Sequence, residues 1–377
     1  MVEYMTRDNV EMIEFNCTGY LRLILMLFIC FWAFGCPEPS GIVLSISGFA
    51  IPAFFILSGY YVLDNKREVR LEKTLRKIKR TALCFLIVFV FYVAVNLPLV
   101  FLTNMRIAFT KRMFFEFFVM NLWPLPIGSN IWFLQAMLYA YIIIFFLDKL
   151  KLLRYYKVFL VILFIFMIIT GEFAGVIRFN NILGYSFISG NWLTRALPYI
   201  LLGRLLREKK RSLMNVQFWK YLIAFVIGGA LVIAELMILS WTGFFRYDGH
   251  MIGFCIMAVA VCGLAISIPV NRPNPIIHFD SALSGFIYVF MNPIYYWLGL
   301  LLAANYSSFI QYASGPVALL ISFFIALILC FTPLGKIFFT NWDMRLAGAV
   351  VIDEDDDEDE PLRPNMPPVR GPRIDPD

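Results

Sequence analysis

Apolar residues dominate this chain in long runs that are separated by short polar segments. A helix that crosses about 30 Å of hydrocarbon needs roughly 20 apolar residues. Ten runs approach that length: Tyr20–Gly35, Gly41–Leu63, Thr81–Leu102, Ile131–Leu147, Val158–Thr170, Trp192–Leu206, Trp219–Trp241, Met251–Val270, Ser281–Ala304 and Gly315–Phe339. The fifth and sixth runs are short, as expected of tilted or partly re-entrant helices. The pattern predicts an all-α integral membrane protein with about ten transmembrane helices.

The composition supports a membrane protein. Hydrophobic residues make up 60% of the 377 residues and charged residues 15%, against roughly 25% charged in a soluble domain. This excludes a nucleic-acid-binding protein, a disulfide-rich secreted domain and a cytosolic enzyme. The seven cysteines show no metal-ligand spacing, so we expect structural thiols, no metal site and no bound cofactor.

Loop charges predict the orientation of the helices in the membrane. The second, fourth and sixth connections, Asp64–Arg80, Asp148–Lys157 and Arg207–Arg211, carry eight, four and four Lys or Arg residues. The connections on the other side carry few. Because cytoplasmic loops are rich in Lys and Arg, we expect a plasma-membrane protein with both termini in the cytoplasm.

Three regions follow from this organisation. Residues 1–19 form a cytoplasmic N-terminal arm, residues 20–345 form the membrane domain, and residues 346–377 form an acidic, Pro-rich tail. The last 25 residues hold ten acids and three arginines, a composition that favours disorder. A solvated tail is the simpler interpretation, and a docking strip for a basic cytoplasmic partner is the alternative.

Ionisable residues inside membrane spans are costly and often functional. Glu235 lies deep in the seventh span and must pair, face a cavity or be protonated. Asp248 and His250 in RYDGH form a second candidate for base chemistry, although a turn with a solvated His explains them as well.

Basic residues also lie near span ends. Arg22 opens the first span, where it can extend its charge to the lipid headgroups or bind a ligand. Three others lie near the ends of later spans and anchor those ends or line a site for a polar acceptor: Arg178, Arg195 and Arg246.

Six segments in order resemble the acyltransferase-3 family of membrane O-acyltransferases. They are YLRLILMLFICFWAFG, IPAFFILSGYYVL (residues 51–63), LEKTLRKIKR, NIWFLQAMLYAY, LPYILLGRLL (residues 197–206) and SGFIYVFMNPIYY (residues 284–296). The resemblance covers nearly the whole membrane domain. It implies acyl transfer from a cytoplasmic acyl-CoA co-substrate to a hydroxyl of a cell-surface glycan or lipid-linked sugar. It also implies that Arg22, Ser58, Tyr60 and Trp132 bind the donor.

The chain departs from the family at two histidines. In the family, the Arg of the first span is followed by ten residues and then by a His that serves as the catalytic base, and this chain has Ala33 at that position. Many also carry a Tyr-x-x-His motif late in the chain. Here Tyr288 matches the Tyr, and Met291 occupies the position of the His. Since neither Ala nor Met accepts a proton, three interpretations stay open. Glu235 or His250 replaces the base; the protein is an inactive member with a structural or regulatory role; or it exports a glycan.

Overall fold

The computed structural model describes residues 13–34, 42–103, 110–119, 121–170, 192–241, 251–270, 280–302, 308–332 and 349–351. Helices make up nearly all of this part. They are α1 (Thr18–Phe34), α2 (Ile42–Ser47), α3 (Ala50–Val62), α4 (Arg67–Thr103), α5 (Lys111–Phe118), α6 (Trp132–Lys149), α7 (Tyr156–Thr170), α9 (Leu197–Glu208), α10 (Lys210–Met214), α11 (Phe218–Trp241), α12 (Ile252–Ser267), α14 (Asp280–Leu302) and α15 (Ser308–Cys330). Short helical turns precede three of them: η1 (Ser129–Ile131), η2 (Leu152–Tyr155) and the π-helical η5 (Trp192–Ala196).

Five described helical segments are long and apolar enough to cross a membrane. They are Ser45–Val62, Arg67–Phe101, Ser129–Lys149, Leu152–Thr170 and Phe218–Trp241. Shorter apolar helices cover Thr18–Phe34, Ile252–Ser267 and Ser314–Cys330. The two remaining predicted spans fall on η5 with α9 and on α14. The helical class of the prediction is therefore confirmed, whereas five spans rather than ten are supported by length and composition.

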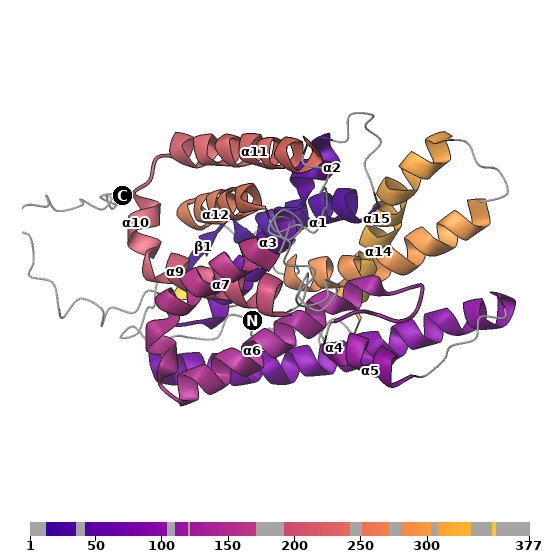
Figure 1. The fold of residues 1–377 in the computed structure, drawn as a ribbon, viewed down its shortest axis with the longest axis horizontal. Coiled ribbons are helices and arrows are strands. Elements are labelled where there is room, and N and C mark those ends of the chain that lie inside the picture. Colours follow the sequence, from indigo (N-terminus) through magenta and orange to yellow (C-terminus); the bar gives the residue numbers. More distant parts are fainter. Residues whose placement is uncertain are drawn as a thin grey trace, which may run out of the picture.

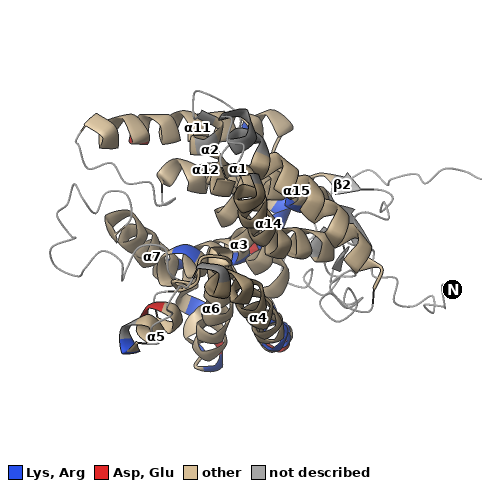
Figure 2. Cartoon of the chain, turned by 90° about the vertical axis from the view of Figure 1, so that its right-hand side faces the viewer, with Lys and Arg blue, Asp and Glu red and all other residues tan. Residues whose placement is uncertain are grey.

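The long helices run roughly along one direction, the long axis of the molecule (Figure 1). Viewed along that axis, they form a bundle whose ribbons are mostly tan, the colour of uncharged residues, with a few charged positions (Figure 2). Four pairs of helices make the most extensive contacts: α14 with α15, α11 with α12, α3 with α9, and α4 with α6.

Two details differ from the sequence prediction. The basic segment after the second span is mostly helical, because α4 continues from Arg67 to Thr103 without a break. The second span is interrupted between α2 and α3. A Cβ atom on Gly48 in that interruption would lie 2.5 Å from the Phe254 ring, so the close approach of α12 requires a glycine here.

A short three-stranded sheet adds to the helices. β1 (Ile13–Asn16) pairs antiparallel with β2 (Pro269–Val270) on one side and with β3 (Ala349–Val351) on the other. Phe15 lies opposite both Val270 and Ala349. The sheet joins the N-terminal arm to the first residues of the predicted tail, which the sequence pattern did not indicate.

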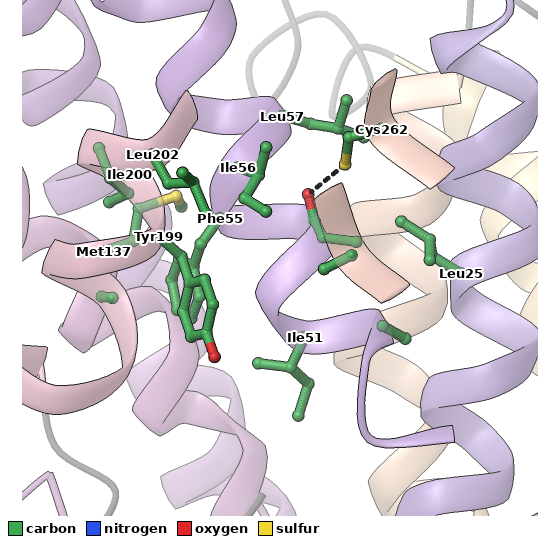
Figure 3. Close-up of a cluster of buried hydrophobic side chains, with 14 of the residues drawn as sticks. Leu25, Ile51, Phe55, Ile56, Leu57, Met137, Tyr199, Ile200, Leu202 and Cys262 are labelled. Atoms are coloured by element: carbon green, nitrogen blue, oxygen red, sulfur yellow. Dashed lines mark hydrogen bonds between the residues drawn. The ribbon is translucent and has the colours of Figure 1, made fainter. Parts of the chain in front are cut away.

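Helix α3 is the centre of the bundle. The span that contains it is 72% buried, whereas the spans in α4, α7 and α11 are each 22% buried. The apolar residues of α3 pack against Tyr199 and Ile200 of α9 and Met137 of α6 (Figure 3). The Cys262 thiol of α12 donates to the Ala53 carbonyl on the other side. The FFILSGYY part of the second sequence motif therefore lies where α1, α9 and α12 pack against α3.

The contact between α3 and α9 is made backbone to backbone. A Cβ atom on Gly59 would lie 2.0 Å from the Ile200 carbonyl oxygen, and one on Gly203 would lie 2.2 Å from the Ile56 carbonyl oxygen. Only glycine permits helices to approach so closely. The glycines of two sequence motifs, FFILSGYY and LPYILLGRLL, thus have a packing function.

Candidate functional site

A small pocket lies where α1 ends and α3 begins. Its walls come from the end of α1, the α2–α3 junction, η5 and α9, and they consist of Trp32, Gly48, Ile51, Pro52, Arg195 and Tyr199. Two of these residues, Ile51 and Tyr199, lie beside the buried apolar cluster of α3 and α9 (Figure 3). The pocket therefore combines an aromatic and aliphatic wall with one guanidinium group.

Arg195 brings two predicted site residues together. It lies in the π-helical turn η5, a local conformation that is frequent at functional sites. Its guanidinium carbon lies 5.2 Å from the centre of the Trp132 ring, a cation–π distance. The sequence assigned Trp132 to the donor and Arg195 to the acceptor, so the structure joins residues that were predicted for different substrates.

Trp32 is a further lining residue of the pocket. Its indole Nε1 is buried and has no hydrogen-bond partner among the described residues. A buried donor without a partner carries a desolvation cost of about 1–3 kcal/mol. Trp32 was not among the residues predicted for a site, although it precedes Ala33, the position of the family histidine.

The opposite end of α1 carries basic residues. The Arg22 guanidinium carbon lies 5.2 Å from the centre of the Tyr61 ring, and Tyr61 shares a hydrogen bond with Thr18. Lys77 of α4 lies within electrostatic range of both Arg22 and Arg80. We call Arg22, Lys77 and Arg80 the basic cluster. Since Trp32 follows Arg22 by ten residues and a helix rises 1.5 Å per residue, the cluster lies roughly 15 Å from the pocket along α1.

Lys77 and Arg80 were not among the predicted site residues. The signal that could have found them is the basic motif LEKTLRKIKR, which contains both. Sequence alone did not show which of its five basic residues turn toward Arg22. The continuation of α4 through this motif decides it, because residues three apart on a helix share a face.

An ionic network holds the helix ends near the basic cluster. Arg70 of α4 donates to both carboxylate oxygens of Asp148 at the end of α6, at 2.8 and 2.9 Å. The Asp64 carboxylate accepts from Lys73 at 2.5 Å and from Arg207 of α9 at 2.7 Å. Burial raises the pKa of Asp64, but Arg207 and Lys73 outweigh it, so the net pKa lies below its usual value. The network joins α3, α4, α6 and α9.

Two predicted donor residues lie inside the packed bundle. The Ser58 hydroxyl shares a 2.7 Å hydrogen bond with the Tyr141 hydroxyl of α6, and Tyr60 is fully buried. Ser58 and Tyr60 therefore take part in helix packing. Arg22 and Trp132, the other two predicted donor residues, lie at opposite ends of the bundle. The four residues predicted to bind the donor do not meet at one point.

Glu235 has a defined structural contact. It is 4% exposed, and its carboxylate oxygens accept from the backbone N–H groups of Ile252 and Gly253 at 3.1 and 3.3 Å. These are unpaired donors of the first turn of α12, so Glu235 caps that helix. The contact lies two residues after His250. His250, Arg178 and Arg246 themselves lie outside the described residues.

The two positions of the missing histidines have different surroundings. Met291 is 2% exposed and packs in the core, whereas Ala33 is exposed near the end of α1. Next to Met291, Tyr288 and Asn130 are linked by hydrogen bonds. No proton-accepting side chain therefore occupies either position.

The fold and its helices define a polytopic helical membrane protein. The model of acyltransferase family 3, described as an acyltransferase domain, matches residues 17–334. This chain belongs to that family, and it is a membrane acyltransferase-like protein. Neither the curated proteins nor the solved structures contain a match.

Proposed function

We propose that this protein transfers an acyl group, such as acetyl, from a cytoplasmic acyl-CoA to a hydroxyl of a cell-surface glycan or lipid-linked sugar. The observation that carries the donor half of this proposal is the basic cluster. Arg22 of α1 lies over the Tyr61 ring at 5.2 Å, and both Arg22 and Arg80 act electrostatically on Lys77 of α4. A concentration of positive charge attracts a phosphate-bearing ligand.

The proposal places the protein in the plasma membrane, with the basic cluster and both termini in the cytoplasm. The distribution of Lys and Arg among the loops supports this orientation. The Trp32–Arg195 pocket would then lie nearer the outer face. Arg195, with Arg178 and Arg246, would contact the acceptor. The acidic tail stays available to a basic cytoplasmic partner.

The proposed reaction needs a proton acceptor. The acceptor hydroxyl attacks the thioester carbonyl, its proton passes to a base, and the CoA thiolate leaves. Glu235 and His250 are the proposed bases. Glu235 accepts a hydrogen bond from Ile252, which follows His250 by two positions in the sequence.

A direct test is the equilibrium binding of coenzyme A to the purified protein in detergent. We expect Lys77→Gln to weaken binding about tenfold or more, the loss associated with a hydrogen bond to a charged group. Arg76→Gln is the matched control. Arg76 lies on the same helix but is exposed and paired with Glu72, so its loss should leave affinity unchanged. Equal affinities of Lys77→Gln and the wild type would remove the donor-site assignment.

The second candidate is an inactive family member that exports a glycan or serves as a structural or regulatory subunit. The occupation of the two histidine positions by Ala33 and the buried Met291 favours it. Release of coenzyme A from acetyl-CoA separates the candidates. Release by the wild-type protein in the presence of an acceptor supports the enzyme, and release only by Ala33→His supports a lost catalytic function.

A further inference from the structure

We propose that the acidic run of the C-terminal tail, residues 353–360, docks on the basic cluster of Arg22, Lys77 and Arg80 and competes there with a phosphate-bearing ligand. The tail acts as an autoinhibitory segment that covers the cluster until the ligand displaces it. This inference rests on the proposed function only for the identity of the ligand as coenzyme A, because the docking itself requires no acyl transfer. Once displaced, the acidic run becomes accessible to a basic cytoplasmic partner.

The first observation is the strand that carries the start of the tail. β3 ends at Val351, which lies opposite Ile13 of β1. β1 in turn ends two residues before α1 begins, and Arg22 lies in the second turn of α1. The acidic run, which lies outside the described residues, begins two residues after β3. The sheet therefore fixes the origin of the acidic run beside the helix that carries Arg22.

The second observation is the reach of the acidic run. The path from Val351 to Arg22 crosses one strand spacing, follows β1 to α1 and rises about one helical turn. The two residues therefore lie no more than roughly 30 Å apart. Residues 352–360 span up to about 30 Å when they are extended. The acidic run is thus long enough to reach the basic cluster from its anchor in the sheet.

The third observation is the complementary charge of the two parts. Every residue from 353 to 360 is acidic. The groups that act electrostatically on Lys77 are Arg80, Arg22 and the Cys84 thiol, with no carboxylate of a described residue among them. Opposite charges attract, and a short tether within one molecule raises their effective concentration to the millimolar range. The acidic run is therefore a suitable occupant of the basic cluster.

The test follows cleavage of the tail by a glutamate-specific protease in the full-length protein at low ionic strength, where attraction between exposed charges is least screened. A docked acidic run is protected, so we expect Lys77→Gln to speed the loss of the tail about threefold or more. Mass spectrometry of the intact protein measures this loss. Arg76→Gln is the matched control, since Arg76 is exposed on the same helix and paired with Glu72. Equal cleavage of Lys77→Gln and the wild type would overturn the proposal.

Carbodiimide cross-linking of the wild-type protein measures the contact without any substitution, because it joins a carboxylate to a lysine amine that touches it. We expect the acidic run to link to Lys77 more than to Lys220, which is exposed at the start of α11. Absence of a link to Lys77 would show that the acidic run does not dock there and is left to a basic partner, which would also overturn the proposal.

A variant of the tail separates this inference from the donor proposal. Replacement of residues 353–360 by Asn and Gln removes their charge and should tighten binding of coenzyme A about threefold or more. Asp375→Asn is the control, because it lies in the same tail beyond the acidic run. If the neutral and wild-type tails give equal affinities, the tail does not compete and the inference is wrong. If neither protein binds coenzyme A but Lys77→Gln still speeds cleavage, the donor proposal fails and the docking stands.

Discussion

Asn130 and Tyr288 bind one another through two hydrogen bonds, although they lie 158 positions apart in the chain. The Asn130 side-chain amide donates to the Tyr288 carbonyl at 2.5 Å, and the Tyr288 hydroxyl donates to the Asn130 carbonyl at 2.8 Å. The Tyr92 hydroxyl donates to the side-chain oxygen of Asn130 at 2.8 Å. This contact joins the fourth and sixth sequence motifs, so α4, η1 and α14 meet at Asn130.

Loss of this link should destabilise the fold. Asn130→Ala leaves the Tyr288 carbonyl and the Tyr92 hydroxyl each without one partner, and we expect a loss of about 1–3 kcal/mol, seen as a lower thermal unfolding midpoint in detergent. Asn292→Ala is the control, because its amide makes a weaker 3.4 Å contact with Ser129 and one 2.9 Å contact with the Gly128 amide. A larger effect at Asn292 than at Asn130 would contradict this ranking.

The α3–α9 contact should not tolerate a methyl group. Gly59→Ala places a Cβ atom 2.0 Å from the backbone oxygen of Ile200, so the helices must separate. We expect a loss of at least 1–3 kcal/mol, the range for overpacked cores, and a low yield of folded protein by size-exclusion chromatography. Gly299→Ala is the matched control on α14, since no atom lies within 4 Å of its added Cβ. A well-folded Gly59→Ala protein would show that α9 can move.

The Asp64 carboxylate should make the thermal stability of the folded protein depend on pH in the acidic range. Its pKa is lower in the folded protein than in the unfolded chain, so its contribution is complete above the unfolded value of about 3.9 and is lost as the pH falls through the folded value. We expect unfolding midpoints that are steady near neutrality and fall below about pH 4, and a smaller acid-dependent fall in Asp64→Asn.

Asp64→Asn should also lower stability at neutral pH. It leaves Lys73 and Arg207 without their counter-charge in a partly buried site, where removal of one partner costs about 3–5 kcal/mol. Glu72→Gln is the control, because its ion pair with Arg76 is more than half exposed on both sides and such pairs contribute about 0–1 kcal/mol. Equal losses of stability in Asp64→Asn and Glu72→Gln would show that the ionic network does not stabilise the contact between the helix ends.

Two substitutions can separate a helix-capping role of Glu235 from a role as the base. Glu235→Ala removes the cap of α12 and should cost about 1 kcal/mol in the thermal unfolding of the protein. Glu235→Gln keeps one oxygen that can accept from Ile252 or Gly253 but cannot take up a proton. As a proposed base, Glu235 should be needed for turnover, so we expect Glu235→Gln to retain most of the stability and to lose acyl-CoA turnover. Retained turnover would show that Glu235 only caps α12 and would leave His250 as the proposed base.

Much of the fold could be read from apolar runs alone, because each predicted span coincides with at least part of a helix. The interruption at Gly48 could not, since it depends on the Phe254 ring of a distant helix. The site was predicted less well. Trp132 and Arg195 were selected for different substrates, and their 5.2 Å contact arises from the packing of η5 against α6, which no local pattern records.

The sequence by itself determined that this chain is a helical membrane protein of an acyltransferase family. It also determined that Ala33 and Met291 occupy the two histidine positions, because hydropathy, motif order and residue identity are properties of the chain alone. Only the tertiary structure decided which residues share a site. It placed Lys77 near Arg22, and it brought Trp132 within a cation–π distance of Arg195. The physical reason is that helix packing sets these distances, and packing depends on side chains far apart in the sequence.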